Sequence, residues 1–179
     1  MRKASLSDAF RAENVEGAVA VGQTAAVDVS EHLDAPCPPE LLFAWVEDLT
    51  TYPSWLDIVP RAAPADAGEG DAALPAWTVE LRGRLGPLAR SKRLRMVRTR
   101  HEAPHQVTFE RREVDGRSHS PWVLRAEVEP TADGSRLTMH LHYGGGMWGS
   151  VLERLLGDEI GQSRTRLLDR LASGRPVPE

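Results

Sequence analysis

The sequence predicts an α+β fold in which an antiparallel sheet of about seven strands packs against a long C-terminal helix. Two observations lead to this prediction. From Leu74 to Tyr143 the apolar residues alternate with a period of two, as in strands that bury one face. From Met147 to Ala172 they recur at helical spacing instead, which indicates a helix of about seven turns.

The first strand and the first helix have their own signals. Residues 25–33 alternate, with the odd-numbered side chains, Glu31 among them, on one face. Pro38 and Pro39 then supply a helix start, because proline is tolerated in the first helical turn. Leucine, tryptophan and valine side chains follow at helical spacing as far as Leu49. A short amphipathic helix is expected there.

Turn residues divide the rest of the sheet. Residues 60–73 are rich in Pro, Ala, Gly and Asp, which predicts one weak edge strand followed by a mobile acidic loop. Beyond this loop the alternation is broken at Gly86-Pro87, Ala103-Pro104, Asp115-Gly116 and Ala132-Asp133-Gly134. Four turns predict five consecutive antiparallel strands.

Each turn also predicts which residues lie opposite one another, because the length of a hairpin connection sets its register. The expected pairs are Trp77 with Met96, Arg98 with Phe109, Phe109 with Trp122, and Trp122 with Tyr143. These pairs keep the apolar residues on one face. They also predict a single cross-strand row that runs from Arg98 to Tyr143.

The composition and the termini set the expected domain boundaries. Residues 1–23 have few large apolar side chains and no run long enough for a signal or membrane segment, so a flexible N-terminal extension is expected. Residues 24–173 are the expected folded domain, and residues 174–179 a short tail. The one cysteine, Cys37, cannot form an intrachain disulfide and fits a reduced, cytoplasmic protein without an integral membrane segment.

The segment from Asp34 to Trp55 resembles the opening of a known group of proteins. A strand ending in Ala35-Pro36, a helix begun by Pro38-Pro39-Glu40, an acidic turn and then Tyr52-Pro53-Ser54-Trp55 are similar to START and polyketide-cyclase proteins of the SRPBCC superfamily. The resemblance covers residues 24–173 and suggests a bacterial member. It implies a helix-grip fold, in which a curved antiparallel sheet wraps around the long C-terminal helix and two short helices follow the first strand. It also implies an apolar cavity between sheet and helix.

Residues on the inward face of the sheet and of the helix are the candidates for the wall of this cavity. The expected ligand-binding residues are Trp55, Trp77, Leu81, Leu94, Met96, Arg98, Phe109, Arg111, Trp122, Leu124, Tyr143 and Leu155. For each aromatic residue, ordinary core packing is the competing interpretation. Trp55 could lie at the cavity mouth or anchor the corner where the short helices meet the sheet.

Charged residues on the inward face are a sharper signal, because burying an unpaired charge is costly. Arg98 and Arg111 could stack on aromatic rings or bind a ligand carboxylate through the guanidinium fork. The alternative is a buried ion pair with Glu31 or Glu113. Lys92 lies near the Gly86-Pro87 turn, where a long side chain reaches water, so it is expected at the rim.

Other classes of site are not favoured. Residues 82–100 are basic, but the chain has a net charge of −4 and acidic residues occupy the neighbouring strands, so no nucleic-acid partner is expected. His140 and His142 lie on the outward face and supply only two ligands, so no metal is expected. The run Gly144–Gly146 lacks the spacing of a phosphate loop, and no other cofactor motif is present.

Two classes of function fit these observations. The first is a carrier or binding protein for a hydrophobic, aromatic or lipid-like small molecule, such as a lipid, a quinone or a polyketide. The second, which the resemblance implies is possible, is a polyketide aromatase or cyclase in which Arg98 or Arg111 stabilises an enolate and Tyr143 relays a proton. A third is a protein-binding domain of the co-chaperone type. No motif compels catalysis, and the sequence leaves the ligand and the oligomeric state open.

Overall fold

The computed structural model describes residues 26–68, 70–71, 73–85, 88–145, 162–174 and 176. In chain order its elements are β1 (Val27–Ala35), α1 (Pro39–Ala44), the 3₁₀ helix η1 (Leu49–Ser54), β2 (Arg61–Ala65), β3 (Ala76–Leu85), β4 (Leu88–Glu102), β5 (Gln106–Arg111), β6 (Trp122–Thr131) and β7 (Gly134–Tyr143). A further helix covers residues 162–172. The expected extension at residues 1–23, the turn at Gly86-Pro87 and the 147–161 part of the expected C-terminal helix lie outside the described residues.

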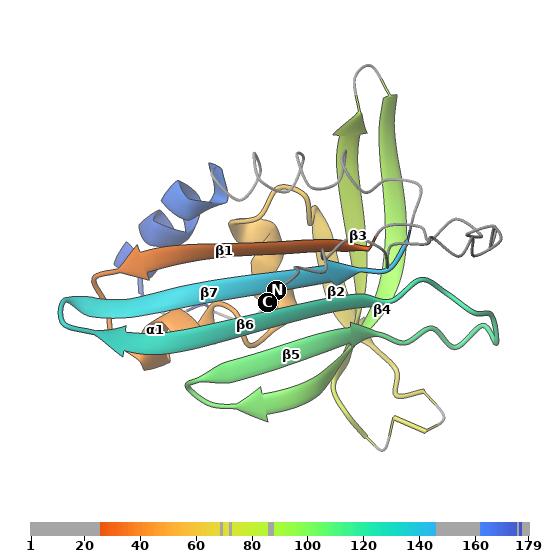
Figure 1. Cartoon of the computed structure of the whole chain (residues 1–179), viewed down its shortest axis with the longest axis horizontal. Helices are drawn as coiled ribbons and strands as arrows, with labels where there is room; N and C mark the ends of the chain where they lie inside the picture. Colours follow the sequence, from red (N-terminus) through yellow and green to blue (C-terminus); the bar gives the residue numbers. More distant parts are fainter. Residues whose placement is uncertain are drawn as a thin grey trace, which may run out of the picture.

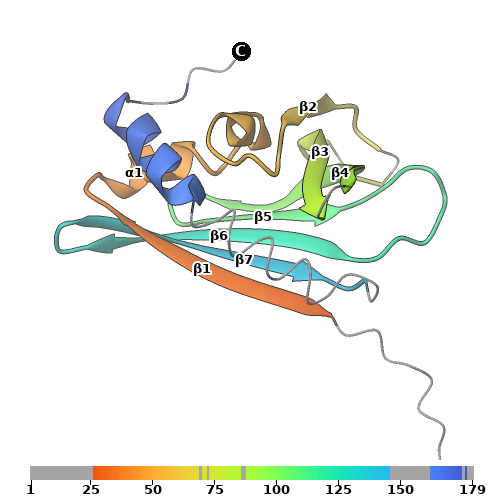
Figure 2. The same cartoon turned by 90° about the horizontal axis from the view of Figure 1, so that it is seen from above.

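The seven strands of the described chain form one antiparallel sheet in the order β1-β7-β6-β5-β4-β3-β2. The first strand therefore pairs with the last, and β2 is the edge strand that the sequence predicted. Figure 1 shows β1, β7, β6 and β5 side by side, with the β3–β4 hairpin rising steeply at one end. In Figure 2, α1, η1 and helix 162–172 all lie on the same face of the sheet. The helix-grip fold is confirmed.

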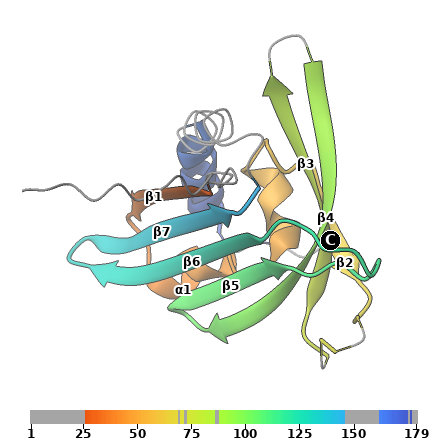
Figure 3. The same cartoon turned by 45° about the vertical axis from the view of Figure 1, so that its right-hand side comes forward.

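The sheet is sharply bent. Figure 3 shows β3 and β4 standing at a steep angle to β5, β6 and β7, so that the sheet wraps partly around the helices. The 15-residue strand β4 spans both parts of the sheet. The burial of β1 follows the predicted alternation, with Val27 and Ala35 buried on the concave face and the even-numbered residues between them exposed. Within the described residues, no helix has both the length and the hydrophobicity needed to cross a bilayer.

Three of the four predicted hairpin registers are confirmed. Trp77 lies opposite Met96, Arg98 opposite Phe109, and Trp122 opposite Tyr143. The pairing of Phe109 with Trp122 was wrong, because Phe109 lies opposite Leu124 instead. The shift is two residues, so the concave and convex faces are still as predicted, but the row from Arg98 to Tyr143 is broken.

The connection between β5 and β6 explains this shift. It is a long loop and not a tight turn, and polar contacts hold it in shape. Arg111 Nε donates to Glu113 Oε1 at 2.6 Å, and Arg111 Nη2 lies 3.0 Å from His119 Nδ1. On its other side, His119 Nε2 lies 2.9 Å from Asp115 Oδ1. Because of these contacts, residues that a two-residue turn would have placed in the two strands belong to the loop.

The short helices begin where the sequence places their caps. Pro38 is the extended N-cap of α1, and Glu40 lies in its first turn, where a negative charge is favourable. The helix ends at Ala44, earlier than the expected Leu49. The acidic turn then starts a new element, because the Asp48 side chain accepts a hydrogen bond from the Thr50 amide at 2.8 Å and caps η1.

A β-bulge interrupts β4 near its end. Arg98 pairs with Phe109, but the next paired residues are Arg100 with Thr108 and His101 with Val107. One residue is therefore extra on β4, and the faces exchange beyond it.

The sequence predicted a mobile acidic loop after β2. In the structure, an ion pair and hydrogen bonds attach this loop to the convex face of the sheet. Arg95 on β4 donates to Asp71 Oδ2 at 2.6 Å and to the Asp66 carbonyl at 2.8 Å. Arg112 also lies 3.5 Å from the Asp71 carboxylate. The side chains of Arg95 and Asp71 are each only 8% exposed. Turn-rich composition predicted the loop correctly and gave no sign of the buried ion pair that holds it.

Candidate functional site

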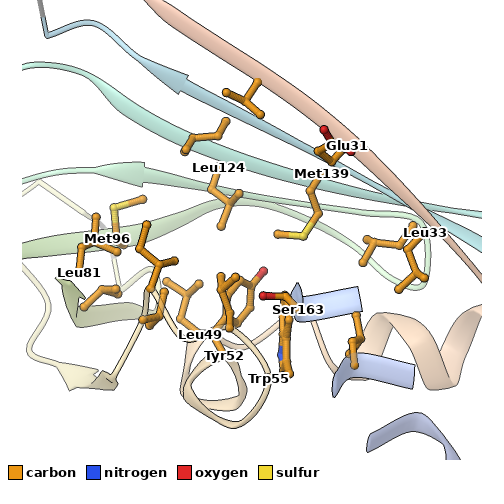
Figure 4. Close-up of a pocket in the computed structure, with 18 of the residues that line it drawn as sticks. Glu31, Leu33, Leu49, Tyr52, Trp55, Leu81, Met96, Leu124, Met139 and Ser163 are labelled. Carbon is orange, nitrogen blue, oxygen red and sulfur yellow. The ribbon is translucent and has the colours of Figure 1, made fainter. Parts of the chain in front are cut away.

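A cavity lies between the concave face of the sheet and the helical elements (Figure 4). The volume of the cavity is about 110 Å³. A single buried water molecule needs roughly 10 to 15 Å³, so the cavity has room for a small organic molecule.

The described wall of the cavity is almost entirely apolar. Strands β1, β6 and β7 contribute Val29, Leu33, Trp122, Leu124, Leu137, Met139 and Leu141. The β3–β4 hairpin contributes Val79, Leu81, Leu94 and Met96. The opposite side is formed by η1 and the residues after it, and by Ser163, Arg164 and Leu167 of helix 162–172.

Tyr52 and Trp55 lie on the floor of the cavity, which places the Tyr-Pro-x-Trp segment at the site (Figure 4). Their ring centres are 4.8 Å apart. The Tyr52 hydroxyl donates to the carbonyl of Val46 at 3.1 Å. Burial, with a smaller contribution from the nearby Asp48 carboxylate, raises the pKa of Tyr52, so this phenol stays neutral. The Tyr52 ring therefore acts as apolar surface, while the buried Trp55 indole N–H has no hydrogen-bond partner within the described residues.

Helix 162–172 is held over this floor by contacts on its polar side. Arg166 Nη2 lies 2.6 Å from Asp57 Oδ2, and Arg170 Nε donates to the Ser54 carbonyl at 3.2 Å. The Trp45 indole donates to the Gly174 carbonyl at 3.1 Å, so the first residue after the expected folded domain is also anchored.

One polar pair occupies the wall. Arg164 Nη2 donates to Glu31 Oε2 at 3.2 Å, and both side chains are partly exposed. The sequence placed Glu31 on the inward face of the first strand and offered Arg98 or Arg111 as its ion-pair partner. In the structure the partner of Glu31 is Arg164 instead.

The structure brings half of the sequence-predicted site residues to the cavity. Trp55, Leu81, Leu94, Met96, Trp122 and Leu124 line it. Trp77, Arg98, Phe109, Arg111 and Tyr143 share the inward face but are not part of the described wall. Leu155 lies outside the described residues.

Trp77, Phe109 and Arg98 form a group of their own beside the cavity. The rings of Trp77 and Phe109 meet edge to face with centres 5.5 Å apart. The Arg98 guanidinium lies 5.7 Å from the Trp77 ring centre and donates to the Glu47 carbonyl at 3.1 Å. Arg98 therefore connects the sheet to the segment between α1 and η1.

Arg111 and Tyr143 also have partners, Glu113 outside the wall and Trp122 within it. Arg111 is 7% exposed and is held by Glu113, as one alternative from the sequence proposed. The Tyr143 ring packs on Trp122 with centres 5.0 Å apart.

Sequence reasoning missed several wall residues that carried a usable signal. Met139 and Leu141 have the same parity as Tyr143 on the last strand, so alternation alone would have found them. Ile58 and Val59 belong to irregular backbone after η1, where no periodicity marks the inward side chains.

No group of three or more side chains suited to holding a metal occurs in the described part of the chain.

A family model matches residues 26–173; its description is polyketide cyclase / dehydrase and lipid transport. Solved structures share the fold at low sequence identity. A START superfamily protein from Mycobacterium smegmatis is 15% identical, with a TM-score of 0.62 over 82% of this chain and 97% of that one. The Zhui aromatase/cyclase from Streptomyces sp. R1128 is 8% identical, with a TM-score of 0.59 over 83% and 94% of the two chains. No curated protein matches the sequence significantly.

Proposed function

Because the chain belongs to the polyketide cyclase / dehydrase and lipid transport family, we propose that it binds a hydrophobic, aromatic or lipid-like small molecule in the cavity between its sheet and its C-terminal helix. The protein acts as a carrier or binding protein in this proposal.

The apolar wall supports the proposal. Leu124, Met139 and Leu141 are partly buried side chains on the concave face, and all three line the cavity. Each CH₂ group that a ligand moves from water to such a wall contributes about 0.8 kcal/mol. The Glu31–Arg164 pair is the main polar feature of the described wall, so shape and burial, with few polar contacts, would select the ligand.

The aromatase or cyclase alternative has less support. Its candidate catalytic residues, Arg98, Arg111 and Tyr143, are not part of the described wall, and Arg98 and Arg111 are engaged by Glu47 and Glu113. An acid or base must come within hydrogen-bond reach of the reacting atoms to act. Ligand binding needs only the cavity.

Binding of a neutral apolar probe tests the proposal. N-phenyl-1-naphthylamine becomes fluorescent in apolar surroundings, and we expect it to bind the full-length protein saturably, with one site per chain. Leu124→Trp, which puts a larger side chain into the cavity, should weaken this binding at least about tenfold because the same space is filled. Titration by fluorescence, with calorimetry for the stoichiometry, measures both.

The matched control is Val123→Trp on the same strand. Val123 is adjacent to Leu124 and points to the convex face, so the substitution Val123→Trp adds a large side chain outside the cavity. Its binding should equal that of the wild type. A wild-type protein that does not bind the probe, or a Leu124→Trp protein that binds it normally while folded, would count against the cavity as the binding site.

A further inference from the structure

Lys92 lies on β4, two residues before Leu94 of the cavity wall, in the β3–β4 hairpin that rises from the sheet in Figure 1. It has the same parity on β4 as Leu94 and Met96, and it pairs across the hairpin with Leu81. All three of these apolar neighbours line the cavity. The stem of Lys92 therefore continues the row of side chains that forms this wall.

The ammonium group of Lys92 reaches across the concave face. Its Nζ lies 5.5 Å from the centre of the Tyr143 ring on β7, although β5 and β6 separate the two strands in the sheet. The Tyr143 ring in turn packs on Trp122, which lines the cavity. The bend of the sheet in Figure 3 permits this approach. A cation thus stands over the Tyr143 ring, beside an apolar wall.

This cation has no acidic partner within ion-pair distance in the part of the chain that the structure describes. The acid whose charge acts on Lys92, Glu113, is already bound to Arg111 at 2.6 Å. Burial and the positive charge of Arg111 lower the pKa of Lys92, which means that its surroundings disfavour the charged form. An anion placed beside Lys92 would relieve that cost.

We propose that Lys92 forms an anion subsite at the edge of the cavity, and that the ligand is an amphipathic organic acid. The apolar body of the ligand fills the cavity, and its carboxylate or similar anionic group contacts the ammonium. This inference rests on the proposed function, because the subsite acts only on a molecule held in the cavity. Hydrogen bonds between charged groups are stronger than those between neutral ones, so the subsite adds both affinity and selectivity.

Two probes with the same apolar body separate this inference from the proposed function. N-phenyl-1-naphthylamine is neutral, and 8-anilino-1-naphthalenesulfonate carries one sulfonate on the same ring system. We expect the wild-type protein to bind the sulfonate more tightly than the neutral probe. Lys92→Met should lower this preference about tenfold, because the charge is lost while an apolar stem of similar length is kept. Lys92→Arg should restore most of it.

The control is Arg93→Met, which removes the same charge from the next residue on β4. Arg93 is exposed, as Lys92 is, but it pairs with Glu80 and faces the convex side, so the preference should stay at its wild-type value. An unchanged preference in Lys92→Met overturns the anion subsite and leaves the proposed function standing. Failure of both probes to bind the wild type overturns both proposals.

Discussion

Replacement of Asp71 by Ala is expected to lower the free energy of unfolding by about 3 kcal/mol, because it leaves the buried guanidinium of Arg95 without its counter-charge. Two backbone carbonyls, of Asp66 and Arg112, still accept hydrogen bonds from Arg95, which places the loss near the lower end for a broken buried ion pair. Urea unfolding of both proteins, followed by circular dichroism, measures the difference.

The exposed pair of Arg136 and Asp34 supplies the control. Its geometry is as good, with Arg136 Nε 2.6 Å from Asp34 Oδ1, but the side chains are 46% and 57% exposed. Arg136→Ala should leave the unfolding curve within experimental error of the wild type, since water solvates both ions. Equal effects of the two substitutions would show that the loop is not held by a buried charge.

The same ion pair makes a prediction about pH. Burial alone would raise the pKa of Asp71, but the hydrogen bond and charge of Arg95, with help from Arg112, more than offset it and hold the pKa below its ordinary value. A lowered pKa in the folded state stabilises the protein above the unfolded value of about 4, and this contribution is lost as the pH falls through the folded value. The stability gap between the wild type and Asp71→Asn should therefore narrow below about pH 4. A gap that stays constant down to acid unfolding would contradict this assignment.

Gly134→Ala is the second substitution with a large expected effect. Gly134 begins β7 with a φ of +152°, and an added Cβ would collide with the carbonyl oxygen of Ala35 and lie 2.9 Å from the Cys37 amide nitrogen. Every atom it meets is backbone, so no side chain can rotate away. We expect a loss of about 3 kcal/mol from overpacking and backbone strain together. Thermal unfolding by calorimetry measures it.

Gly116→Ala separates the two contributions. Gly116 also has a positive φ, of +70°, but an added Cβ there would meet nothing within 4 Å. Only the backbone cost of about 1 kcal/mol should appear. If both substitutions cost the same, the contact between the β6–β7 turn and the end of β1 is looser than the structure has it.

Much of the fold was predictable because alternation and turn residues are local signals. The pairs Trp77–Met96 and Trp122–Tyr143 follow from turns whose residues allow only short connections. The register predicted from the Asp115-Gly116 turn was wrong, because Arg111 contacts both Glu113 and His119 and the connection is longer than a two-residue turn. Side-chain contacts of this kind have no periodicity, so the sequence pattern could not show them.

The candidate site was predictable only in part, for a different reason. Parity tells which face a residue is on and not where along the face the helices leave space. Trp122 and Phe109 are both aromatic residues with inward parity, yet Trp122 lines the cavity while Phe109 is fully covered by Trp77 and its other neighbours. The packing of Trp77 on Phe109 accounts for this difference, and the sequence pattern does not give that packing.

The bulge in β4 allows one strand to serve two different surfaces. Before it, Leu94 and Met96 belong to the cavity wall; after it, the change of phase turns His101 toward α1, where its ring lies 5.7 Å from that of Phe43 and its Nε2 lies 2.8 Å from Glu47 Oε2. With strict alternation, Arg100 would face α1 instead. The contact between β4 and α1 therefore depends on a single inserted residue. A one-residue deletion at Thr99 would change what α1 meets and leave the ligand-facing half of the strand in register.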